Sequence, residues 1–68
     1  MKKVEGRKGE YNEFVEFVLG AKHSIIAQKG SAGWWYVFEN KHGSIATLDQ
    51  YQQKGNAVNK ARQIAESK

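Results

Sequence analysis

The chain has 68 residues, a formal net charge of +4 and no cysteine or proline. A chain this short forms one domain and buries only about 60% of its unfolded surface, so such domains often need a disulfide, a metal or a partner. The absence of cysteine excludes disulfides and thiolate metal sites, and self-association becomes the expected extra support.

Residues 1–9 are predicted to be a flexible basic arm, followed by a single α+β domain over residues 10–68. The arm carries most of the net charge through Lys2, Lys3, Arg7 and Lys8. Such an arm can bind phosphates or only keep a small protein soluble, and both interpretations stay open. The sequence shows no signal peptide and no apolar run of membrane length, so we expect a cytoplasmic protein.

Residues 11–19 are predicted to form a helix. Tyr11, Phe14, Val15 and Val18 recur at helical spacing, and Gly20 stands where a helix commonly ends. A strand is the competing interpretation, because phenylalanine and valine favour sheets.

Three short segments then predict the strands of an antiparallel meander: 23–28, 34–39 and 44–48. Glycines mark both intervening turns, and Gly43 is expected to take the left-handed conformation. Because side chains alternate along a strand, Trp34 and Trp35 must lie on opposite faces of the sheet.

A C-terminal helix is predicted after Asn56, which is expected to be its N-cap. Its apolar stripe consists of Ala57, Val58, Ala61, Ile64 and Ala65. The alanines would let the helix pack closely against one face of the sheet. The predicted fold is therefore α+β, with the order α-β-β-β-α.

No pattern typical of catalysis is present. The serines lack a G-x-S-x-G context, and the glycines match neither a dinucleotide nor a phosphate-binding loop. His23 and His42 lie far apart, with no cluster of carboxylates around either. We therefore expect no enzyme, no cofactor and no metal.

The tryptophan pair carries the functional prediction, because one indole must lie away from the C-terminal helix. The N-terminal helix could cover that indole, or it could lie in a protein interface, where Trp and Tyr are enriched. Stacking on nucleic-acid bases is a third use of an open aromatic sheet. The candidate protein-binding residues are Trp34, Trp35, Tyr36 and Val37.

Residues 35–61 resemble the YegP-like family of small bacterial proteins. The matching positions are Tyr36, Phe38, Asn40 to Gly43, Ile45, Ala46, Tyr51, Lys54 and Ala57. The resemblance implies a β-β-β-α unit that packs in pairs, as a tandem repeat or as a dimer. It implies no catalytic or binding residue.

The order α-β-β-β-α also resembles the double-stranded RNA-binding domain. When Ala57 and Ala61 are aligned, Lys54 matches one lysine of that family, but Gly55 and Val58 occupy the positions of two others. Integrase arm-binding domains share the three strands and the helix, which is a likeness of topology alone.

The sequence thus predicts a small non-enzymatic protein-binding module that forms a homodimer through an aromatic sheet face, and its expected role is that of an adaptor or inhibitor of a larger assembly. Another protein is the other expected partner. The alternative is binding of the nucleic-acid backbone through the arm and the last helix. The residues of that alternative are Lys2, Lys3, Arg7, Lys8, Lys54, Lys60 and Arg62.

Overall fold

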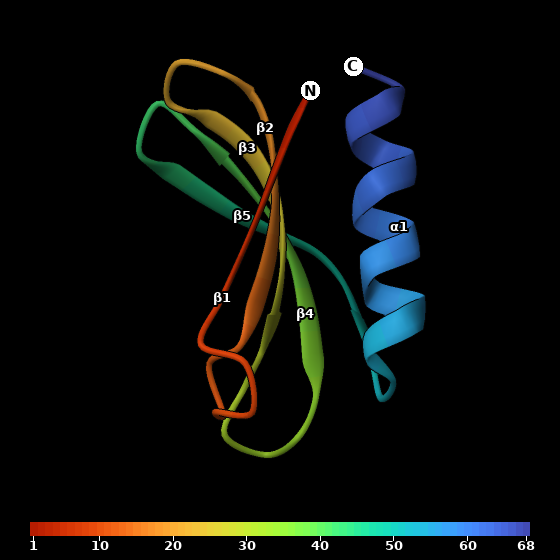
Figure 1. Cartoon of the computed structure of the whole chain (residues 1–68). Coiled ribbons are helices and arrows are strands. Elements are labelled where there is room, and N and C mark those ends of the chain that lie inside the picture. The colour runs from red at the N-terminus through yellow and green to blue at the C-terminus, as the bar shows by residue number, and fades with distance from the viewer.

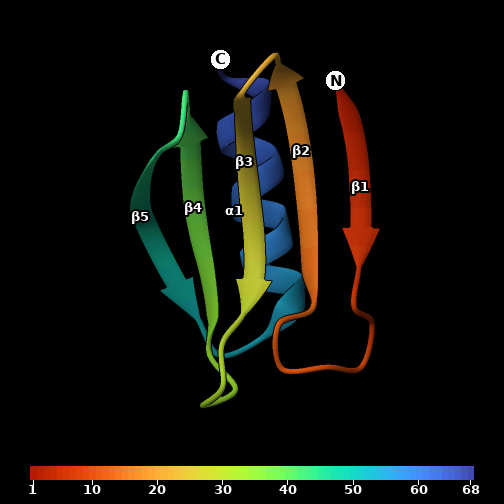
Figure 2. The ribbon, with the colours of Figure 1, turned by 90° about the vertical axis from the view of Figure 1, so that its left-hand side faces the viewer.

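The computed structural model describes residues 1–68 and contains one antiparallel sheet and one helix (Figure 1). The elements are β1 (Lys2–Gly6), β2 (Phe14–Gly20), β3 (His23–Lys29), β4 (Trp35–Lys41), β5 (Ser44–Tyr51) and α1 (Lys54–Glu66). The five strands lie side by side in chain order, each paired with the next. Figure 2 shows α1 behind the sheet, so that one face is covered and the other is not.

The prediction of a helix over residues 11–19 is wrong, because β2 occupies most of this segment. β2 pairs with β1 on one side and with β3 on the other. Val15 and Phe17 are buried under α1, whereas Phe14 and Val18 lie on the opposite face. The helical stripe left out Phe17, and only alternation with a period of two places this residue in the core.

The segment assigned to a basic arm contains β1, an edge strand of the sheet. Its register with β2 runs from Lys2 opposite Val18 to Gly6 opposite Phe14. The sheet therefore has five strands where the sequence predicted three, and the fold begins with a strand instead of a helix. The α+β class still holds.

The three strands that the sequence predicted are present as β3, β4 and β5. The turn between β4 and β5 contains His42 and Gly43, with φ angles of 54° and 87°. The left-handed conformation expected for Gly43 is thus confirmed, and two positive φ angles in a two-residue turn match the twist of a β-hairpin.

The C-terminal helix covers one sheet face, as predicted, although it begins earlier than expected. Gln53 takes the N-cap position, and Asn56 lies inside the first turn. Ala57, Ala61 and Ala65 follow one another at four-residue intervals and are all buried. The helix packs on β2, β3 and β4 and also contacts β5, but it does not contact β1.

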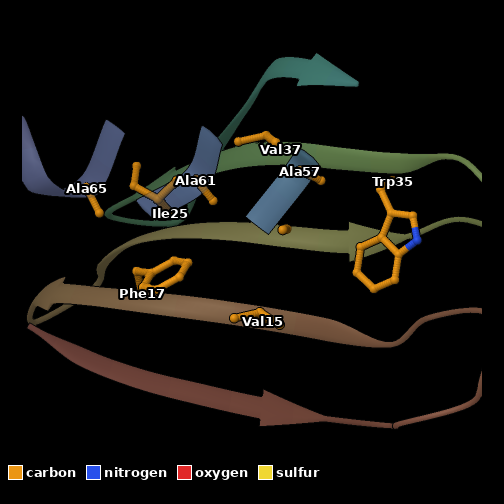
Figure 3. Close-up of a cluster of buried hydrophobic side chains, with 9 residues drawn as sticks. Val15, Phe17, Ile25, Trp35, Val37, Ala57, Ala61 and Ala65 are labelled. Atoms are coloured by element: carbon orange, nitrogen blue, oxygen red, sulfur yellow. The ribbon is translucent and has the colours of Figure 1, made fainter. Parts of the chain in front are cut away.

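The hydrophobic core lies between these alanines and the covered sheet face (Figure 3). The sheet contributes Val15, Phe17, Ile25, Ala27, Trp35 and Val37. Small side chains on the helix leave room for the large ones on the strands, because protein interiors are close-packed. The indole of Trp35 fills the space beside the first turn of α1.

Ala61→Leu should destabilise the protein by about 1–3 kcal/mol, because no space remains for a larger side chain between the helix and the sheet. Urea unfolding measures this change. Asn59→Leu, on the exposed side of the same helix, is the control and should change the free energy of unfolding by less than about 0.5 kcal/mol. Equal stability of the two variants would contradict the close packing of α1.

Candidate protein-binding surface

The face of the sheet turned away from α1, called the open face, is covered by no other element (Figure 2). The strand register arranges its residues in three rows across the sheet. These rows are Lys2, Val18, Ser24, Asn40 and Ile45; Val4, Glu16, Ile26, Phe38 and Thr47; and Gly6, Phe14, Gln28, Tyr36 and Gln50. The register thus places residues of all five strands on one surface.

Aromatic and aliphatic side chains lie near the middle of the open face. Tyr36 and Phe38 lie two residues apart on β4, and their rings stack with centroids 6.2 Å apart and planes at 28°. Ile26 lies directly opposite Phe38 on β3. All three are only half-buried, because they cover one another without a layer of helix above them.

Two of the rings on the open face lie against glycine. A Cβ atom on Gly6 would come within 2.7 Å of the Phe14 ring, and one on Gly30 within 2.8 Å of the Tyr36 ring. Both glycines therefore permit a close approach that any other residue would obstruct. The guanidinium of Arg7, 5.8 Å from the ring centroid of Phe14, further confines that ring.

Charged side chains on the open face are confined to its β1–β2 side, where Lys2, Glu16 and the Arg7 guanidinium over the Phe14 ring lie. The part of the face formed by β3, β4 and β5 is neutral. The other polar residues there are amides and hydroxyls. Depletion of charge with retention of aromatics is typical of the buried centre of protein interfaces, and amide and hydroxyl groups provide adaptable hydrogen bonds.

The four residues predicted to bind protein are divided by the sheet. Trp35 and Val37 lie beneath α1 with 5% and 0% of their surface exposed, so they contact the helix. Tyr36 lies on the open face, and half-buried Trp34 precedes β4, its carbonyl oxygen accepting a hydrogen bond of 2.7 Å from the Gly30 N–H. The buried indole thus belongs to the core.

Sequence reasoning missed Phe14, Ile26 and Phe38 as members of this surface. Alternation along β4 could have identified Phe38, which must share a face with Tyr36. Phe14 could be placed there only after its segment was recognised as a strand. Ile26 required the register between β3 and β4, which a sequence pattern does not contain.

The seven cations of the nucleic-acid alternative are divided between the β1 end of the sheet and α1. Lys2 and Lys3 lie on opposite faces of β1 because neighbouring residues alternate. Lys54 forms an ion pair with Glu13, and the Arg62 guanidinium lies 5.5 Å from the centroid of the Phe17 ring. The cationic groups of Lys54 and Arg62 are therefore already engaged in contacts within the chain.

A partly buried ion pair holds the first turn of α1 against the sheet. The Lys54 ammonium donates a hydrogen bond of 2.5 Å to Oε2 of Glu13, whose side chain is 12% exposed. The Gly9 N–H donates to the other carboxylate oxygen at 3.3 Å. The Lys54 hydrogen bond is the main reason that the pKa of Glu13 lies below its usual value.

A second carboxylate lies at the opposite end of the helix. Oε2 of Glu39 is 2.7 Å from Nε2 of His23 and 3.4 Å from the Lys68 ammonium. The hydrogen bond with His23 is the main cause of the lowered pKa of Glu39. Ser24 follows His23 in the chain but lies on the other face of the sheet, so this His–Glu pair has no adjacent nucleophile from that residue.

A third carboxylate lies on β5. Asp49 accepts hydrogen bonds of 2.8 Å from the Tyr51 hydroxyl and from the Gln50 N–H. The bond with Tyr51 lowers the pKa of Asp49 and raises that of Tyr51. Glu13 and Glu39 thus connect elements of the fold, whereas the contacts of Asp49 stay within β5.

The chain matches no protein-family model, and comparisons with curated proteins and with solved structures likewise find no match. The resemblance to the YegP-like family therefore stays a prediction. The resemblance to the double-stranded RNA-binding domain relied on the order α-β-β-β-α, which the structure does not have. The single helix has neither the length nor the hydrophobicity to cross a membrane.

The free energy of unfolding should fall as the pH drops below about 5. Glu13, Glu39 and Asp49 have lowered pKa values in the folded protein, against about 4.3 for Glu and 3.9 for Asp in the unfolded chain. Their stabilisation is complete above the unfolded pKa and is lost as the pH falls through the folded one. Urea unfolding between about pH 6 and pH 3 measures this loss.

A variant with Glu13→Gln and Glu39→Gln should lose much of this pH dependence. Glu66→Gln is the matched control, because it removes a carboxylate that is exposed and makes no hydrogen bond. A double variant with the same acid sensitivity as the wild type would show that these two carboxylates do not stabilise the fold through their charge.

Proposed function

We propose that the chain is a small non-enzymatic protein-binding module that self-associates through the open face of its sheet. The observation that supports this proposal most is the uncovered group of Phe14, Ile26, Tyr36 and Phe38. An antiparallel sheet can leave one face in water, and that face is then normally polar. Large aromatic rings in the middle of such a face are better explained if a second layer of protein covers them.

A second copy of the chain is a suitable second layer. Two open faces related by a two-fold axis would bring Tyr36 and Phe38 of one copy against the same residues of the other. Each large aromatic side chain then removes about 150–250 Å² from water. An axis near β4 keeps the two Glu16 carboxylates apart, because Glu16 lies two strands away on β2.

The small core gives self-association a physical reason. Four of the nine core residues on which the fold depends are alanines, which bury little apolar area. A second copy would add apolar burial without lengthening the chain. We propose that the resulting assembly serves as an adaptor or inhibitor that acts by binding alone.

Phe38→Arg should weaken self-association at least about 30-fold, which corresponds to the loss of an interface residue worth about 2 kcal/mol. Sedimentation velocity over a range of protein concentrations measures the change. Tyr11→Arg is the matched control, because Tyr11 is 64% exposed and lies outside the sheet. Circular dichroism establishes that both variants remain folded.

A monomeric wild-type protein at all concentrations would overturn the proposal, as would equal masses for the two variants. Salt titration separates this interface from the nucleic-acid alternative. Burial of aromatic side chains should respond little to salt, whereas binding of a DNA or RNA duplex should weaken steeply as salt displaces the contacts with phosphates.

A further inference from the structure

The outer edge of β5 is a second surface, which borders the open face at Ile45 and Thr47. β5 is the longest strand, with eight residues, and the last in the sheet, so the backbone groups on its outer side pair with no other strand. Ser44 to Leu48 are all exposed, including Ile45 at 60% and Leu48 at 41%. An exposed apolar edge of this kind readily accepts another strand.

The two edges of the sheet differ in how they are protected. β1 carries Lys2, Lys3 and Glu5 among its five residues, and charges on an edge strand discourage pairing. β5 has Asp49 as its only charged residue. Its register with β4 is irregular between Thr47 and Asp49, which leaves its first four residues as the regular part of the edge.

A polar hollow of about 340 Å³ lies between the end of β5 and α1. It is lined by Tyr51 and by Asn56, Asn59, Lys60 and Gln63 of the helix. A second hollow, which includes Ser67 and Lys68, continues along the same side of α1 and shares Lys60 and Gln63 with the first. We call this continuous depression the β5–α1 groove.

Lys60 carries the positive charge of the β5–α1 groove. It forms no ion pair, whereas Lys54 and Lys68 each contact a glutamate. The negative charge of Asp49 lies close enough for Lys60 to help lower the pKa of that carboxyl, but the Asp49 oxygens accept hydrogen bonds from Tyr51 and Gln50 and none from Lys60. An acidic side chain of a ligand would find an unpaired ammonium group at Lys60.

We infer that the β5 edge binds an extended acidic peptide segment of another protein as a sixth strand. Backbone hydrogen bonds to β5 would supply affinity, and alternate side chains would supply specificity. Side chains on one face of the peptide would lie beside Ile45, and those on the other face would lie beside Ala46, on the side of the sheet that carries α1. The peptide therefore needs apolar residues on its first face and an acidic residue within reach of Lys60.

A second copy of the chain meets these requirements less well. Its own β5 offers only Asp49 as an acidic group, and that carboxylate is already bonded within its own chain. The inference therefore concerns a partner with a different sequence. It does not depend on self-association through the open face.

A phage-displayed library of random dodecapeptides, selected on the immobilised full-length protein, tests this inference. The expected result is enrichment of peptides in which apolar and acidic residues alternate. A synthetic copy of one selected peptide should then shift the amide NMR signals of residues 44–51 and of the groove side of α1. No enrichment, or shifts confined to the open face, would overturn the inference.

Lys60→Glu should weaken binding of the selected peptide about tenfold or more, because an attractive charge-assisted contact becomes repulsive. Lys8→Glu makes the same charge change outside the groove and should leave the affinity within about twofold. Equal affinities for these two variants would contradict the assignment of Lys60.

Ala46→Lys adds a charge to the edge strand on the side away from the open face and should also reduce peptide binding. Phe38→Arg, on the open face, should not affect it, so failure of self-association and failure of peptide binding remain distinguishable. Concentration-dependent shifts of residues 44–51 in the absence of peptide would show that a second copy occupies the edge, which would overturn the inference.

Discussion

The close contact between three alanines of α1 and the middle of the sheet determines the rest of this structure. Ala57, Ala61 and Ala65 place the helix directly over β2, β3 and β4, and the larger side chains of the strands fill the space between. Because one thin helix covers only the centre of a five-stranded sheet, the outer strands extend beyond it. The β5 edge stays accessible for this reason, whereas the open face is accessible because no element lies on that side of the sheet.

Polar contacts position the helix along this apolar stripe. The Glu13–Lys54 pair lies at its first turn, and Glu39 contacts both His23 and the terminal Lys68. Apolar packing is non-directional, whereas these charge-assisted bonds specify the position of each end. Glu13 and Glu39 therefore have a structural use.

The two proposed surfaces use different physical interactions. The open face offers rings such as Tyr36 and Phe38, whose burial is the source of affinity and responds little to salt. The proposed β5 edge site would use unpaired backbone groups, with Lys60 near the end of the strand at Tyr51, so binding there would be directional and would favour an acidic partner. A single small domain could thus associate with itself and present a peptide site at the same time.

Local patterns in the sequence determined β3, β4, β5 and the helix, since alternation, turn glycines and an alanine stripe act over a few residues. They also predicted that Trp34 and Trp35 lie on opposite faces of the sheet. Residues 14–20 carried both a helical and a strand pattern, and pairing with β1 and β3 decided between them. The tertiary structure alone decided which face the helix covers, because the alternation on β4 is the same whichever side is buried. That choice placed Trp35 and Val37 in the core and left Tyr36 and Phe38 in water.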